Sequence, residues 1–189
     1  MTTGEHDGGP AALRSHGPWV DLHAHPGRCF VGPARLPAAA AAARSAGLAA
    51  TSFSTVGDLA ILGFDDAGRI VQAREFESGE AAKDHDRQLA ALAVLRRRQD
   101  VVVVESAGDI ARAHREGRCG AILMAEGADF LGAEAGGLEA AWRAGVRSVT
   151  LVHYAQNLSG DVQTSPSRHG GLSAFGVELV REMNRLGIL

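Results

Sequence analysis

Short apolar runs alternate with helix-patterned segments along most of the chain. Apolar or Thr/Ser-rich runs begin near residues 20, 49, 101, 121 and 148, and segments with hydrophobic residues at helical spacing lie between them. Such alternation is typical of a parallel β-sheet covered by helices. The run Val101–Val104 contains only valines, as expected for a strand that is buried on both faces. The sequence therefore predicts an α/β protein with five strand–helix units and a further strand that begins at Ile188.

Two α/β architectures fit this pattern, a doubly wound sheet and a TIM-type (β/α)8 barrel. The barrel is favoured because His25, Glu126 and His153 follow three different predicted strands, and barrel active sites are built at the carboxyl ends of several strands. No G-x-G-x-x-G turn follows the first strand, whereas a nucleotide-binding doubly wound fold more often has a glycine-rich turn there. A complete barrel takes roughly 250 residues, so we expect a barrel truncated after about five βα units. Residues 1–17 are predicted to be a flexible tail, and residues 18–189 the N-terminal portion of a single barrel domain.

Composition excludes several classes of protein. Hydrophobic residues make up 46% of the chain, charged residues 22%, and the net charge is −3. These values are typical of a globular domain and give no basic surface for nucleic acid. No apolar stretch is long enough for a membrane span, and residues 1–18 lack the apolar core of a signal peptide. Two cysteines are too few for a disulfide framework. We therefore expect a cytoplasmic protein with no nucleic-acid partner.

The motif His23-Ala24-His25 is the first candidate site. The alternating segment Trp19–His25 is predicted to be the first strand, so both imidazoles point to the same face, as ligands of one metal ion must. Asp21 would share that face and could hydrogen-bond to the ligands. The alternative is a pair of hydrogen-bonded histidines at a strand end with no metal.

Glu126 and His153 are the other candidates. Glu126 follows the buried run Ala121–Ala125, so its carboxylate needs a cation, a donor or water. A carboxylate that bridges two cations leaves between them a water that loses its proton easily and becomes a nucleophile. His153 could be a ligand or a donor that polarises a carbonyl; a solvated glutamate and a histidine that caps a strand remain the alternatives. Lys83, the only lysine, falls within a predicted helix, so no lysine can form a carbamate bridge between metals.

Several segments resemble the membrane dipeptidase (renal dipeptidase) family of zinc metallopeptidases. They are Glu126-Gly127, Gly145–His153, Asn157, Gly171–Gly176 and Val180–Ile188, in the family's order and spacing. The resemblance extends from about residue 119 to the end, is weaker over 19–56, and is uninformative over 57–118. It implies a (β/α)8 barrel with two divalent metal ions, zinc in this family, that hydrolyses dipeptides, and it suggests a homodimer.

The resemblance also implies roles for individual residues. It makes His23 the first metal ligand, Glu126 the bridging ligand, and His153 a residue that contacts the substrate; Asn157 is assigned to substrate binding. The family usually has aspartate where this chain has His25. If His25 is a ligand, its neutral imidazole removes one negative charge and favours a softer divalent ion. The family takes further ligands from later strands, so residues 1–189 alone are expected to be inactive.

The sequence therefore predicts a metal-dependent dipeptidase. In this interpretation a metal-activated bridging water attacks the peptide carbonyl, and His153 stabilises the oxyanion. One alternative is a metal-dependent amidohydrolase that acts on a non-peptide amide or lactam. Another is a non-catalytic barrel fragment with a binding or structural role.

Overall fold

The computed structural model describes residues 15–26, 35–132 and 137–189. The chain divides into two compact units, one formed by Met1–Phe53 with Val94–Ile122 and the other by Ser54–Ala93 with Leu123–Leu189. Strands β2 and β6 each begin in the first unit and end in the second. Most of the predicted flexible tail over residues 1–17 lies outside the described residues.

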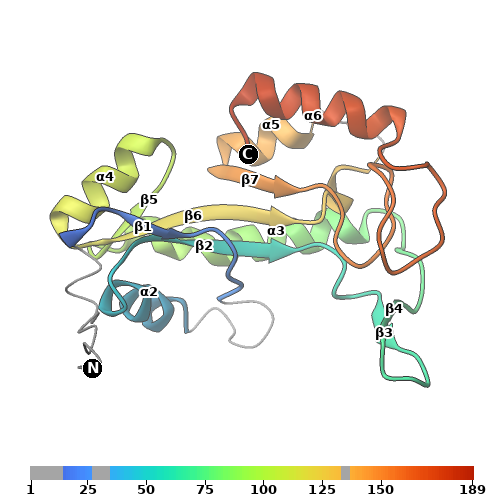
Figure 1. Cartoon of the computed structure of the whole chain (residues 1–189), viewed down its shortest axis with the longest axis horizontal. Coiled ribbons are helices and arrows are strands. Elements are labelled where there is room, and N and C mark those ends of the chain that lie inside the picture. Colours follow the sequence, from blue (N-terminus) through green and yellow to red (C-terminus); the bar gives the residue numbers. More distant parts are fainter. Residues whose placement is uncertain (1–14, 27–34, 133–136) are drawn as a thin grey trace, which may run out of the picture. The chain divides into compact units, whose positions relative to one another are not determined.

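The first unit is built from parallel strands and their connecting helices (Figure 1). Its elements are β1 (Trp19–Asp21), α2 (Leu36–Ser45), the start of β2 (Leu48–Val56), most of the 3-10 helix η2 (Ala93–Arg97), β5 (Val101–Val103), α4 (Ala107–Glu116) and the start of β6 (Cys119–Glu126). Strand β1 pairs in parallel with β2, and β5 with β6. Gly120 allows close packing on β2, because a Cβ there would lie 2.7 Å from the Cβ of Ala50.

The second unit contains the ends of β2 and β6 and most of the helices. Its other elements are β3 (Leu62–Phe64), β4 (Ile70–Gln72), α3 (Glu80–Leu92), the 3-10 helix η3 (Asp129–Leu131), α5 (Gly137–Arg143), β7 (Val146–Thr150) and α6 (Ala174–Leu186). Strand β7 pairs in parallel with β6, and α5 and α6 lie side by side next to β7 (Figure 1). Their apolar faces form a core around Leu138, Val146 and Leu179. No helix in the described ranges has the length and apolar character that crossing a bilayer requires.

The predicted α/β fold with a parallel sheet is confirmed. The strand order is β1-β2-β6-β5, with β7 also paired to β6. Strand β6 therefore neighbours β2. In a barrel whose strands follow chain order, β5 would occupy that position. The backbone of Leu189 donates to Arg147 O at 3.0 Å and accepts from Val149 N at 2.9 Å. This pairing with β7 agrees with the strand predicted to begin at Ile188.

The glycine-rich segment 57–78 has the composition expected of a loop, but it contains the antiparallel hairpin β3–β4 (Figure 1). Asp65 Oδ1 accepts the backbone N–H groups of Ala67 and Arg69, both at 2.9 Å. Gly68 takes a positive φ of 73° that other residues rarely adopt. The turn residues, rather than an apolar alternation, therefore define this hairpin.

Candidate functional site

The histidine pair lies in the first unit, directly after β1. The rings of His23 and His25 contact edge to face, with centroids 4.7 Å apart. The prediction that both lie on the first strand was wrong, because β1 ends at Asp21. Asp21 Oδ1 accepts the His23 N–H at 2.9 Å, and Ser52 Oγ binds both Ala24 N (2.5 Å) and Ala24 O (3.2 Å). These side-chain bonds replace strand pairing, and a loop anchored on Ser52 brings the two imidazoles together.

Glu126 is the last residue of β6 and is only 5% exposed. Its Oε1 lies 3.7 Å from Nε2 of His153, which follows the end of β7 in the same unit. Strands β6 and β7 are parallel, so their carboxyl ends lie at the same edge of the sheet. The structure therefore brings together Glu126 and His153, as the sequence predicted for residues at strand ends.

Asp58 is a site residue that the sequence analysis missed. It follows β2 and its side chain is fully buried. Its Oδ1 lies 2.7 Å from His153 Nδ1, and its Oδ2 accepts the backbone N–H groups of Tyr154 and Ala155, both at 2.8 Å. Because an ionised carboxylate only accepts, the Nδ1–H of His153 donates to it. Asp58 thereby holds the imidazole with Nε2 toward Glu126.

The surroundings of Asp58 and His153 favour an ionised carboxylate on the first and a protonated imidazole on the second. Burial by itself would raise the pKa of Asp58, but the hydrogen bonds from His153, Ala155 and Tyr154 leave that pKa below its usual value. Burial likewise acts to lower the pKa of His153, but the hydrogen bond and charge of Asp58, with the nearby charge of Glu126, raise it overall. Each partner thus stabilises the ionised form of the other.

Asp129, on η3, is a second carboxyl group that the sequence analysis missed. Both of its oxygens are buried, and neither forms a close hydrogen bond with another described residue; the Asn157 side chain is near enough to act as a weak donor that lowers the pKa of Asp129. Oδ2 packs against two glycines, since a Cβ at Gly57 or Gly127 would lie 2.9 or 2.4 Å from it. Burial, followed by the charge of Asp58, raises the pKa of Asp129 to about 6. Asp58 and Asp129 share one sequence signal, a carboxyl group two or three residues after a buried strand.

Asn157 lies in the loop after β7, and both ends of its side chain bind backbone. Its Nδ2 donates to Leu151 O at 2.9 Å, and its Oδ1 accepts the Ser159 N–H at 2.8 Å. These bonds give Asn157 a role in shaping the loop. Its assignment to substrate binding stays a prediction.

Comparison with known proteins gives the family. Residues 72–189 match the membrane dipeptidase family (peptidase family M19). Dipeptidase tcpJ of Claviceps purpurea (strain 20.1) is 42% identical over 88 residues, which are 46% of this chain and 21% of that protein. An amidohydrolase from Pseudomonas aeruginosa has a TM-score of 0.69 and 24% identity, covering 96% of this chain and 47% of that one. A metallopeptidase from Rhodobacter sphaeroides, solved with a phosphinate mimic of the dipeptide L-Ala-D-Ala, has a TM-score of 0.57 and 23% identity, covering 76% and 45%.

The two solved structures share the fold of this chain, which spans about half of their length. The family match covers residues 72–189 of 189 and includes Glu126, His153 and Asn157. It confirms the resemblance found in the sequence. This chain belongs to the membrane dipeptidase family.

Proposed function

We propose that the protein is a metal-dependent dipeptidase. The observation that carries this proposal is the buried Asp58–His153 pair beside Glu126 in a member of the dipeptidase family. We further propose that His23, His25 and Glu126 are metal ligands for two zinc ions. Imidazole nitrogens and a carboxylate are donors that zinc accepts, and two imidazoles already stand in contact after β1. Bound ions would supply a water of lowered pKa as the nucleophile.

The role of His153 follows from how Asp58 holds it. Because Nδ1–H is occupied by the Asp58 carboxylate, Nε2 is the atom available to a substrate. In the protonated ring, Nε2–H is a donor for the carbonyl oxygen of the scissile bond. A donor fixed before the reaction stabilises the negative charge that this oxygen acquires, at no cost of reorganisation.

Two finer predictions accompany the proposal. A homodimer is expected from the family resemblance, and sedimentation of the purified protein tests it. A cytoplasmic location is tested by fractionation of the producing cells.

The test of the function uses the protein expressed from its complete reading frame. Metal content is measured, and hydrolysis is followed for L-Ala-L-Ala, L-Ala-D-Ala, a non-peptide amide and a lactam. We expect bound zinc and hydrolysis of at least one dipeptide. Hydrolysis of the lactam or the simple amide without any dipeptide cleavage would replace the proposal with the amidohydrolase alternative.

Single substitutions test the ligand assignment. His23→Ala and Glu126→Ala should each remove metal from the protein and nearly all hydrolysis, because the loss of one ligand disturbs the whole site. Glu139→Ala is the control, since Glu139 is an exposed partner of Arg143 on α5. Wild-type metal content and turnover in both His23→Ala and Glu126→Ala would overturn the assignment.

A further inference from the structure

One buried side chain joins helix α3 to the end of β2. Gln88 on α3 is only 8% exposed, and both ends of its amide form hydrogen bonds with the backbone of Val56. Its Oε1 accepts the Val56 N–H at 2.9 Å, and its Nε2 donates to Val56 O at 3.0 Å. The side-chain amide thus pairs with Val56 as a peptide group of a neighbouring strand would.

A carboxylate fixes the orientation of this amide. Asp84, one turn earlier on α3 and paired with Arg87, accepts a hydrogen bond from Gln88 Nε2 at 2.6 Å. Because a carboxylate only accepts, the NH₂ group of Gln88 must face Asp84, and the amide oxygen must face the Val56 N–H. Both N–H donors of the NH₂ group are then in use, so a single arrangement of the amide satisfies all of its partners.

Val56 needs this partner because of the direction in which its backbone groups point. The next residue, Gly57, donates its N–H to Glu126 O on β6 at 2.8 Å. Successive residues of a strand direct their backbone groups to opposite edges, so those of Val56 point away from β6. On that edge the pairing of β2 with β1 extends only to Thr51. Since Val56 is fully buried, losing the Gln88 amide would leave its N–H and C=O groups away from water without these bonds.

A second contact ties the same strand end to α3. His85 lies one turn before Gln88, and its Nδ1 is 3.1 Å from Thr55 Oγ1. The His85 ring also stacks on Phe130 of η3, with centroids 3.9 Å apart. These contacts fix α3 against β2 and η3, so the Gln88 amide is presented to Val56 from a rigid position.

The segment that Gln88 holds leads directly to the proposed catalytic residues. Asp58, at the end of this segment, binds Nδ1 of His153 at 2.7 Å. A change in the course of residues 56–58 therefore moves the Asp58 carboxylate, and with it the imidazole that the carboxylate holds. We propose that Gln88 is a positioning residue, which through the backbone of residues 56–58 keeps His153 Nε2 directed toward Glu126. The catalytic part of this role rests on the proposed function.

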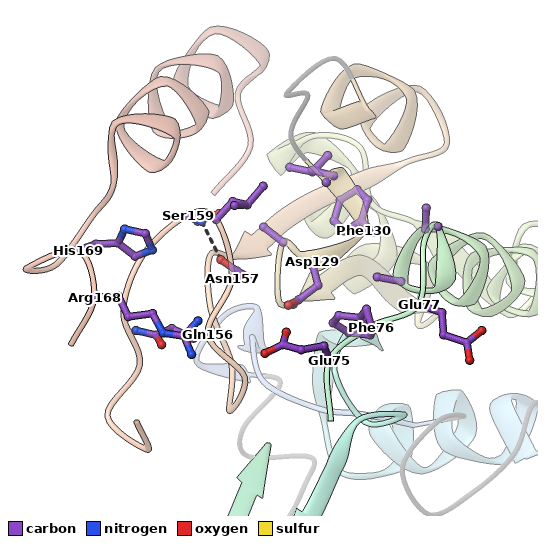
Figure 2. A pocket seen from close by; sticks show the side chains of 17 residues that line it. Glu75, Phe76, Glu77, Asp129, Phe130, Gln156, Asn157, Ser159, Arg168 and His169 are labelled. Carbon is purple, nitrogen blue, oxygen red and sulfur yellow. Dashed lines mark hydrogen bonds between the residues drawn. The ribbon is translucent and has the colours of Figure 1, made fainter. Parts of the chain in front are cut away.

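Gln88 acts from outside the cavity beside these groups. This cavity, of about 540 Å³ within the second unit, is lined by Asn157, which the family resemblance assigns to substrate binding, and not by Gln88 (Figure 2). Its loop wall is shaped by Asp161, whose carboxylate accepts the backbone N–H groups of Arg168 (2.7 Å), His169 (3.0 Å) and Gly171 (2.9 Å). The contacts that shape this wall do not involve Gln88, so loss of the Gln88 amide should change kcat rather than KM.

The first test compares variants of the metal-free, full-length protein by NMR, so that hydrolysis plays no part. Gln88→Met keeps the length of the side chain but removes its three hydrogen bonds. We expect the far-downfield proton of the short bond from His153 Nδ1–H to Asp58 to shift upfield or broaden, because the carboxylate is no longer held in place. If Gln88→Met does not fold, Gln88→Asn replaces it, since its amide is one methylene group too short to reach Val56, and the same shift is expected.

The control separates positioning from a general loss of stability. Leu92 is buried on the same helix, so Leu92→Ala should lower the urea midpoint while it leaves the hydrogen bonds of Gln88 intact. The His153 proton should stay at its wild-type position in this variant. An unchanged proton in a folded Gln88 variant, or the same shift in Leu92→Ala, would overturn the proposal.

The second test measures hydrolysis of L-Ala-L-Ala and L-Ala-D-Ala. Gln88→Met should lower kcat by about tenfold with KM close to that of the wild type, because a small displacement of a catalytic group affects the reaction more than binding. In an Asp58→Asn background the same change should lower kcat by no more than about twofold, since its effect passes through Asp58. An equal effect in both backgrounds would contradict the proposal. A wild-type protein that cleaves neither dipeptide would contradict the proposed function instead, and the NMR comparison would still decide the role of Gln88.

Discussion

Replacing Asp58 with asparagine tests how the imidazole of His153 is held. The carboxylate accepts three hydrogen bonds, from His153 Nδ1–H at 2.7 Å and from the amides of Tyr154 and Ala155 at 2.8 Å. An asparagine has one acceptor oxygen and one NH₂ group. The two backbone amides cannot change, so we expect them to keep the oxygen, which leaves the NH₂ group facing His153 Nδ1. The ring must then accept at Nδ1 and carry its proton on Nε2, the reverse of the neutral form that Asp58 favours.

The structure sets the size of the effect. One charged acceptor is lost at a fully buried position, and three charge-assisted bonds become weaker neutral ones. We expect a loss of about 2–4 kcal/mol in the free energy of unfolding. Without the negative charge of Asp58, the imidazolium form of His153 is less populated at neutral pH. Turnover should fall by about tenfold, less than when the donor itself is lost, because the neutral ring keeps its Nε2–H group but not its positive charge.

Nitrogen-15 NMR of the metal-free protein reports which ring nitrogen of His153 carries the proton, and urea unfolding reports the stability. Asp65→Asn is the matched control, because Asp65 sits on the exposed β3–β4 turn and pairs with Arg69. Asp65→Asn should leave the proton position of His153 unchanged and should alter the free energy of unfolding much less than Asp58→Asn does. An Asp58→Asn protein in which His153 keeps its proton on Nδ1, with wild-type stability, would refute the reasoning.

Three further predictions each have a definite expected sign. His153→Ala should keep the metal content of the wild type and lose about 10²–10³ in turnover; a metal-free variant would make His153 a ligand. Gly176→Ala should lower the free energy of unfolding in urea by about 1–3 kcal/mol, because the new Cβ would lie 2.0 Å from Ser159 O. The control Gly108→Ala, whose new Cβ has its nearest contact at 3.5 Å, should raise that free energy by about 0.5 kcal/mol. The pKa of Asp129 is raised from 3.8 to about 6 in the fold, so metal-free wild type should lose stability as pH rises through that interval, by about 1–3 kcal/mol. Asp129→Asn should show no such loss; parallel pH profiles of the two proteins would contradict the assignment.

Elements with a strong local pattern could be predicted from the sequence. Strand β2 (Leu48–Val56) begins at the Thr/Ser-rich run predicted near residue 49, and helix α4 (Ala107–Glu116) is an amphipathic segment that ends before Gly117. The first strand was predicted too long because one side-chain bond, from His23 N–H to Asp21, ends it. Periodicity does not report such a bond.

The candidate site was predictable only where a residue ends an apolar run. Glu126 and His153 do so, and the sequence identified both. Asp58 and Asp129 lie in glycine-containing turns, where aspartate is common for local reasons. The role of Asp58 depends on a residue 95 positions away. Nothing in the local sequence around Asp58 encodes that contact.

The single carboxylate of Asp161 has an evolutionary consequence. It fixes the course of the loop after β7 through the main-chain amides of Arg168, His169 and Gly171, and at positions 168 and 169 every residue except proline supplies such an amide. The identities of the side chains at positions 168 and 169 are therefore separable from the architecture that carries them. Point mutations at these two exposed positions can change the charge of the loop surface while the backbone keeps its shape. The side chains on this loop can thus diversify among descendants of the same gene in single steps, with Asp161 retained.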